Sequence, residues 1–195
     1  VGVKAHVAAI TERAMRGEIA FEPALRERVA LLKGLPVSVI EEVIGNRITL
    51  SPGARVLVGT MRANGAHTVL VSGGFSLFTR TIAAMAGFDE NHANTLVVED
   101  GVLTGFVEEP VLGPEAKLDT LLAVARHLGV PLADSMAVGD GANDLAMIER
   151  AGLGVAYHAK PAVAAAADVR VDRGNLTALL YLQGYRREEF VEHEQ

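Results

Sequence analysis

Residues 140–144 carry the strongest signs of chemistry in this sequence. Asp140, Asn143 and Asp144 follow the apolar run 136–138 and two flanking glycines, and they precede the helical apolar pattern 145–148. This order predicts a buried strand, a tight turn that the glycines permit, and a helix. Ligands bind at the carboxyl ends of strands in open α/β sheets, and Mg²⁺ prefers carboxylate oxygens with water or phosphate. We therefore expect Asp140 to bind Mg²⁺ beside a phosphate; an ordinary turn capped by Asn143 or Asp144 is the alternative.

A second group of residues is suited to holding an anion. Ser72, Gly73 and Gly74 follow an apolar strand pattern at 67–71 and are expected to form a turn of small residues before the next helix. Glycines let backbone N–H groups approach a phosphate closely, and the serine hydroxyl supplies one more donor. Lys117 opens a predicted helix, from which a flexible ammonium could reach the same phosphate. A capped glycine turn and an ordinary exposed lysine are the alternatives.

Three residues near the N-terminus have two interpretations each. Met15 and Phe21 lie around the turn between the first two predicted helices, where apolar side chains ordinarily form a helical core. Arg28 is either a solvated helix charge or a guanidinium aimed at a carboxylate. The six histidines are scattered without the spacing of metal ligands.

Composition limits the class of protein. The chain has 195 residues, of which 50% are hydrophobic, with a mean hydropathy of +0.27 and a formal net charge of −6. Its basic residues form no dense run, so we expect neither a nucleic-acid partner nor a polybasic membrane anchor. No apolar run approaches the roughly 20 residues of a membrane helix. The absence of cysteine excludes disulfides and thiol chemistry and suits a reducing cytoplasm.

Predicted elements divide the chain near Ile48. The first part is helical throughout, and the second alternates strands with helices, which is typical of an α/β fold with a parallel sheet and helices on both faces. The pair Asp100-Gly101 predicts a β-hairpin within 95–107. Helices are expected at 5–16, 22–33, 36–44, 52–64, 75–86, 116–128 and 142–151, and strands at 67–71, 136–138, 153–156 and 169–171.

Taken in order, Ser72-Gly73-Gly74, Lys117 and the segment 139–144 resemble motifs two, three and four of the haloacid-dehalogenase phosphatase superfamily. Within that superfamily the chain is similar to the phosphoserine phosphatases. Segments that resemble their helical cap are 15–17, 21–22, 25–29 and 31–36. Segments that resemble their core are 71–75, 93–94, 100–105, 137–144 and 159–161.

The resemblance implies a fold and a set of roles. It implies a small helical cap at 1–48, and a Rossmann-like α/β core with a β-hairpin at 49–195. The implied phosphate binders, with catalytic roles for Ser72 and Lys117, are Ser72, Gly73, Gly74 and Lys117. The implied metal site is Asp140, with Asn143 and Asp144 binding phosphate or steadying the metal. The implied cap contacts are Met15 and Phe21, which close over the substrate, and Arg28, which grips the serine carboxylate.

One expected motif does not occur in residues 1–195. The family's first motif, Asp-x-Asp-x-Thr, supplies the nucleophile and the general acid, and a glutamate just after it helps to recognise the substrate amino group. We expect this motif upstream of Val1, on a central strand between those ending at Val71 and Val138. Without this motif, residues 1–195 alone are expected not to hydrolyse substrate.

The resemblance implies hydrolysis of O-phospho-L-serine to L-serine and phosphate through an aspartyl-phosphate, with Mg²⁺, as the last step of serine biosynthesis. A phosphatase for another small phosphomonoester is one alternative, because the cap decides the substrate. A non-catalytic module that binds phosphate and Mg²⁺ is another, should the nucleophile be absent. For the oligomeric state, a homodimer is one alternative.

Overall fold

The computed structural model describes residues 4–15 and 18–192. Its contacts divide the chain into two compact units. The first comprises Val1–Thr49, Ser72–Thr81 and Ala93–Gly113, and the second comprises Leu50–Val71, Ile82–His92 and Pro114–Gln195. Each unit has its own apolar core, so each is described by itself.

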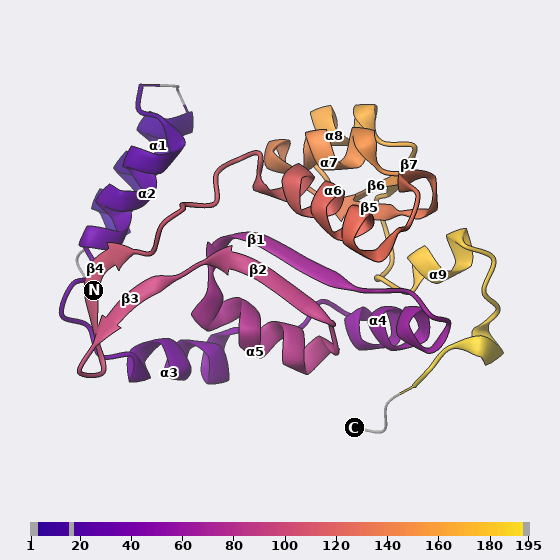
Figure 1. The fold of residues 1–195 in the computed structure, drawn as a ribbon, viewed down its shortest axis with the longest axis horizontal. Helices are drawn as coiled ribbons and strands as arrows, with labels where there is room; N and C mark the ends of the chain where they lie inside the picture. The colour runs from indigo at the N-terminus through magenta and orange to yellow at the C-terminus, as the bar shows by residue number, and fades with distance from the viewer. Residues whose placement is uncertain (1–3, 16–17, 193–195) are drawn as a thin grey trace. The chain divides into compact units, whose positions relative to one another are not determined.

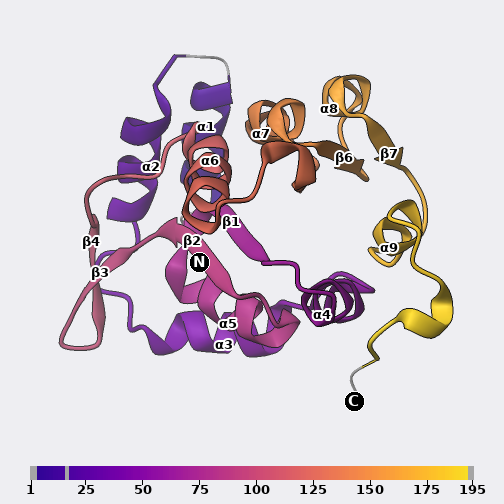
Figure 2. The same ribbon diagram turned by 45° about the vertical axis from the view of Figure 1, so that its right-hand side comes forward.

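The first unit packs helices against a β-hairpin (Figure 2). Its helices are α1 (Lys4–Met15), α2 (Phe21–Ala30) and α3 (Ser38–Arg47), and its hairpin strands are β3 (Leu96–Glu99) and β4 (Val102–Val107). Leu25 and Val29 of α2 are buried against Leu96 and Leu103 of the hairpin. Ile40 of α3 belongs to the same cluster, so one apolar core joins α2 and α3 to the hairpin.

The hairpin turns as its sequence predicts. Glu99 pairs with Val102, and the two residues between them, Asp100 and Gly101, have φ values of 48° and 76°. Two successive positive φ values make the twist of the turn match that of the strands, which is why Asp-Gly is favoured there. The segment between α2 and α3 bonds to β4, since Gly34 N–H donates to the Leu103 carbonyl at 2.8 Å. The segment that connects α2 to α3 therefore covers an edge of the hairpin.

The second unit is a parallel sheet between helices (Figure 1). The strands β5, β6 and β7 pair in that order and in parallel, with Val138 opposite Val155 and Val155 opposite Val169. These strands span Met136–Gly139, Leu153–Tyr157 and Val169–Val171. The helices are α4 (Ala54–Ala63), α6 (Ala116–Leu128), α7 (Leu145–Arg150), α8 (Pro161–Ala166) and α9 (Ala178–Leu182). None of the described helices is long and apolar enough to cross a membrane.

Helices cover both faces of this sheet. Ala156 of β6 packs with Ile148 of α7 and Val163 of α8 on one face. Its neighbour Val155 packs with Leu179 of α9 on the other face, where Leu57 of α4 also joins the cluster. Adjacent residues of a strand point to opposite faces, so β6 is buried on both sides. This arrangement confirms the predicted α/β fold class.

Several element boundaries differ from the sequence-based prediction. The strand expected to end at Val71 continues as β1 (Val69–Phe75), so Ser72, Gly73 and Gly74 are extended rather than a turn, and α5 (Ser76–Ala86) follows directly. The second helix ends at Ala30 rather than Lys33. The third runs through Gly45 to Arg47, since Gly45 keeps an ordinary φ and a glycine inside a helix costs only about 1 kcal/mol.

The expected central strand stays a prediction. Among the described strands, β5 pairs only with β6, and β1 pairs only with β2 (Glu90–Asn94). A boundary near Ile48 between a cap and a core likewise stays a prediction, because the first unit includes residues well beyond it.

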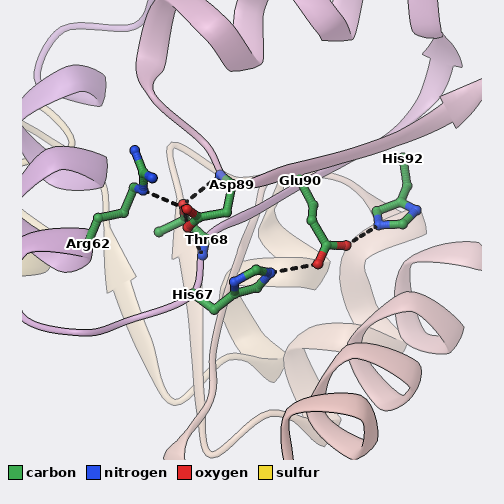
Figure 3. A network of polar contacts seen from close by, with 6 residues as sticks. All are labelled: Arg62, His67, Thr68, Asp89, Glu90 and His92. Atoms are coloured by element: carbon green, nitrogen blue, oxygen red, sulfur yellow. Dashed lines mark hydrogen bonds and ion pairs between the residues drawn. The ribbon is translucent and has the colours of Figure 1, made fainter.

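A polar network in the second unit ties the start of β1 to the start of β2 (Figure 3). The Asp89 carboxylate accepts hydrogen bonds from Thr68 N–H at 2.9 Å and Thr68 Oγ1 at 2.7 Å, and it pairs with Arg62 Nε at 2.7 Å. Glu90 bonds to His67 at 2.7 Å and to His92 at 3.0 Å. Burial raises the pKa of Asp89, but the bonds from Thr68 and the charge of Arg62 outweigh it and hold that pKa below its ordinary value.

We predict that Asp89→Asn lowers the free energy of unfolding at pH 7 by about 1–3 kcal/mol, because partly buried donors lose a charged acceptor. The folded pKa of Asp89 lies below its unfolded value. Its stabilisation is therefore fully present above the unfolded pKa and is lost as pH falls through the folded pKa. Urea unfolding from pH 7 to pH 3 measures the difference between wild type and variant, which should shrink at the acid end.

Asp172→Asn is the matched control, because Asp172 pairs with Arg170 on the surface, where its side chain is 51% exposed. Exposed pairs contribute at most about 1 kcal/mol. A wild-type advantage over Asp89→Asn that does not vary with pH would contradict the role of the ionised carboxylate.

Candidate phosphate and metal site

The turn after β5 is organised around the carboxylate of Asp144. This residue is only 1% exposed. Its Oδ2 accepts hydrogen bonds from the backbone N–H groups of Asp140 and Gly141, each at 3.0 Å, and its Oδ1 pairs with Lys117 Nζ from α6. The bond from Gly141 caps the short 3₁₀ turn Ala142–Asp144 that leads into α7. Asp144 thus closes the 3₁₀ turn but makes no side-chain cap at the start of α7, and it also holds the backbone of Asp140 in place.

Lys117 compensates the buried charge of Asp144. A carboxylate removed from water is costly unless it is hydrogen-bonded and paired with a cation. The Lys117 ammonium contacts Asp144, and the Lys117 side chain as a whole is 18% exposed. An ammonium has three donors, and Asp144 is its one partner among the described residues, so two donors are available to an anion.

The two glycines of the turn are required for space rather than for backbone conformation. Neither Gly139 nor Gly141 has a positive φ. A Cβ on Gly139 would lie 2.3 Å from Asp144 Cβ, and a Cβ on Gly141 would lie 2.7 Å from Asn143 Oδ1. These glycines therefore permit the turn by allowing close approach of the Asp144 and Asn143 side chains.

Asp140 follows the last residue of β5 and is exposed. Its backbone carbonyl accepts a hydrogen bond from Lys160 N–H at 3.0 Å, whereas its carboxylate has no protein partner among the described residues. Within residues 4–15 and 18–192, no three His, Cys, Asp or Glu side chains gather as a metal site. Mg²⁺ commonly binds through one or two carboxylates and keeps water or phosphate as its other ligands. A free carboxylate at this sheet edge fits that mode of binding.

Ser72 and the glycines after it form the candidate anion site of the first unit. Gly74 N–H donates to Ser72 Oγ at 3.0 Å, so the serine oxygen accepts locally and its own proton is free to be donated. Phe21 adjoins this segment, since its Cζ lies 4.0 Å from the position of a Cβ on Gly73. Phe21 also packs against the core cluster of the unit. It is therefore both a core residue and a neighbour of the candidate phosphate binders.

The structure describes the side chain of Arg28 but not that of Met15, the other two predicted cap residues. Arg28 lies two turns beyond Phe21 on α2 and is half-buried, and its Nε donates to the Ala24 carbonyl at 3.2 Å. Its other guanidinium N–H groups have no hydrogen bond in the part of the chain that the structure describes, so they remain available to a ligand. Met15 ends α1, and its side chain lies outside the described residues.

The structure thus gathers the predicted residues into two groups. Lys117, Asp140, Asn143 and Asp144 surround one turn of the second unit. Phe21, Ser72, Gly73 and Gly74 lie together in the first unit. That both groups bind one phosphate stays a prediction.

Sequence reasoning assigned no role to Asn94. The structure shows it buried at the end of β2, with hydrogen bonds to Gly73 and Leu112. The strand that contains Asn94 reads Glu-Asn-His-Ala-Asn, so no local apolar pattern marked Asn94 as a buried residue.

Comparisons with known proteins agree with the resemblance. The sequence matches the haloacid dehalogenase-like hydrolases over residues 4–149. It is 45% identical over 188 residues to a phosphoserine phosphatase of Streptomyces coelicolor, covering 96% of this chain and 46% of that protein. It is 47% identical over 186 residues to a phosphoserine phosphatase of Polaromonas, covering 93% of this chain and 79% of that protein.

The fold is shared with solved structures. A structure described as a phospho-aspartyl intermediate analogue of phosphoserine phosphatase superposes with a TM-score of 0.81 at 41% identity, covering 93% of this chain and 86% of that one. The present chain spans less than half the length of the Streptomyces relative, so similarity to that protein extends to only part of it.

We predict that Gly139→Ala destabilises the protein by about 1–3 kcal/mol, because its Cβ would overlap the buried Asp144 side chain. Gly45→Ala is the control, since no atom lies within 4 Å of its added Cβ and alanine favours the helix. Denaturant unfolding of both variants measures the contrast. Equal effects would show that the turn has room for a side chain.

Proposed function

We propose, from the premise that this chain belongs to the haloacid dehalogenase-like hydrolase family, that the whole protein hydrolyses O-phospho-L-serine to L-serine and phosphate. The observation that carries the proposal is the turn after β5. There a buried Asp144, neutralised by Lys117, presents the unpaired carboxylate of Asp140 at the carboxyl end of a parallel strand. The similarity to phosphoserine phosphatases supplies the substrate.

Phosphatases of this family generally use a divalent metal, and we propose Mg²⁺ held by Asp140. When bound, Mg²⁺ would offset the negative charge of the phosphoryl group. Asp144 would act on this site indirectly, since its two oxygens are engaged by Lys117 and by backbone N–H groups. Asn143, exposed beside Gly141, would bind phosphate or steady the site.

Ser72, Gly73, Gly74 and Lys117 would bind the phosphoryl oxygens. Ser72 retains a hydroxyl proton to donate because its oxygen already accepts from Gly74. Lys117 is held by Asp144 at one of its donors, which fixes the ammonium without using up its hydrogen-bonding capacity. Donors that are already in place stabilise developing charge without reorganising during the reaction.

The helical segment would select the substrate. A guanidinium matches the two oxygens of a carboxylate, so Arg28, with its unused N–H groups, would bind the serine carboxylate. Phe21 adjoins Gly73 and would exclude water from the bound phosphate, with Met15 in a similar role.

Neither aspartate of the turn is suited to be the phosphoryl acceptor. Asp144 is buried with both oxygens bonded, and Asp140 is assigned to the metal. The family resemblance implies an aspartate nucleophile, and the related phospho-aspartyl intermediate analogue supports an aspartyl-phosphate.

We predict that Asp140→Asn lowers kcat for phosphoserine by about two to three orders of magnitude, because charge stabilisation at the phosphoryl group is lost. The thermal midpoint should not change, since this carboxylate has no protein partner among the described residues. Asp134→Asn, the same charge change at another exposed position, is the control. Titration with Mg²⁺ gives the metal dependence, and an unchanged dependence in Asp140→Asn would count against the site.

We predict that Arg28→Ala raises KM for phosphoserine by about 10- to 100-fold, the cost of losing hydrogen bonds to a charged group. KM for O-phosphoethanolamine, which has the amine and phosphate but no carboxylate, should change little. Arg47→Ala in α3 is the control, because Arg47 is exposed. Equal losses with both substrates would remove Arg28 from recognition and favour another small phosphomonoester as the substrate.

A further inference from the structure

Asn94 is a buried amide with all its groups engaged except one acceptor lone pair. It is the last residue of β2 and is 2% exposed. Its Nδ2 donates to the carbonyls of Gly73 and Leu112, each at 3.3 Å, and its Oδ1 accepts from Leu112 N–H at 2.8 Å. A buried amide held on both its donors and its acceptor has one orientation.

The contact with Gly73 reaches Ser72 through one peptide plane. The Gly73 carbonyl and the Gly74 N–H belong to the same peptide group, which is planar. Asn94 holds the carbonyl side of this plane, and the N–H side donates to Ser72 Oγ at 3.0 Å. The direction of the Asn94 amide therefore sets the direction of the Gly74 N–H and the lone pair of Ser72 that accepts it.

The hydroxyl proton of Ser72 is oriented by the same contact. A serine oxygen that accepts from Gly74 must direct its own proton elsewhere, and no protein acceptor receives it within the described residues. A Cβ on Gly74 would lie 3.2 Å from Ser72 Oγ, so the glycine also allows this close approach. The arrangement leaves a directed donor for an anion.

We infer that Asn94 is a positioning residue that orients the Ser72 hydroxyl toward the phosphoryl group through the Gly73–Gly74 peptide. This inference rests on the proposed function only in taking Ser72 to bind phosphate. The alternative is that Asn94 merely ties the segment around Leu112 to β2. The two differ in whether the effect of Asn94 on anion binding depends on the Ser72 hydroxyl.

A double-mutant cycle on the whole protein separates them. Asn94→Ala, Ser72→Ala and the double variant are compared by calorimetric titration with inorganic phosphate, and by kcat/KM for phosphoserine. We expect Asn94→Ala to weaken phosphate binding about tenfold when Ser72 is present, and less than about twofold when Ser72 is already alanine. Equal losses in both backgrounds would overturn the inference.

Thr104→Val is the matched control, because it removes another polar contact of the first unit, the 3.0 Å bond from Thr104 Oγ1 to the Val97 carbonyl, far in sequence from Ser72. It should leave phosphate binding unchanged. Should Asn94→Ala not fold, Asn94→Asp takes its place in the cycle, since it keeps the acceptor for Leu112 N–H and removes the donors. A wild-type protein that binds phosphate with this coupling but does not cleave phosphoserine would refute the proposed function and leave the inference standing.

Discussion

The buried carboxylate of Asp144 is the interaction on which the candidate site depends. It joins α6 to the turn after β5, because one oxygen pairs with Lys117 and the other holds the backbone of Asp140 and Gly141. Removing the Lys117 ammonium would leave the charge of Asp144 uncompensated, and removing the Asp144 carboxylate would leave two backbone N–H groups without their acceptor. The same constraint explains Gly139, since no side chain fits beside Asp144 at that position.

Asn94 applies the same principle in the first unit. Both residues are almost fully buried, and both use a short polar side chain to fix the backbone beside a candidate ligand-binding group. In each case the neighbouring group remains able to bind a ligand. Among the described residues, the Asp140 carboxylate has no protein partner and the Ser72 hydroxyl proton has no protein acceptor. The proposed function thus rests on groups whose positions are determined by neighbouring residues rather than by their own contacts.

Features set by local sequence were predictable. The helix Ala116–Leu128 has the predicted bounds because Gly129 ends it with a φ of 67°, and the Asp100-Gly101 hairpin follows from turn geometry alone. The bond from Gly141 N–H to Asp144 joins residues three apart, which is within the reach of local sequence reasoning. Ser72-Gly73-Gly74 was wrongly expected to be a turn, because pairing with β2 keeps that segment extended and local glycine preference does not report such pairing. The roles of Lys117 and Asn94 depend on partners 27, 21 and 18 residues away, which no local pattern reveals. For Lys117, similarity to a family supplied the assignment.

The central claim is that the Asp144 carboxylate organises the turn after β5. Amide hydrogen exchange of Asp140 and Gly141 tests it most directly, because the N–H groups of both residues donate to this carboxylate. We predict that both exchange slowly in the wild-type protein, and that Asp144→Ala accelerates both at least about tenfold while Ala137 N–H in β5 keeps its rate. Rapid exchange of Asp140 and Gly141 in the wild type, or rates that Asp144→Ala leaves unchanged, would show that this carboxylate does not organise the turn.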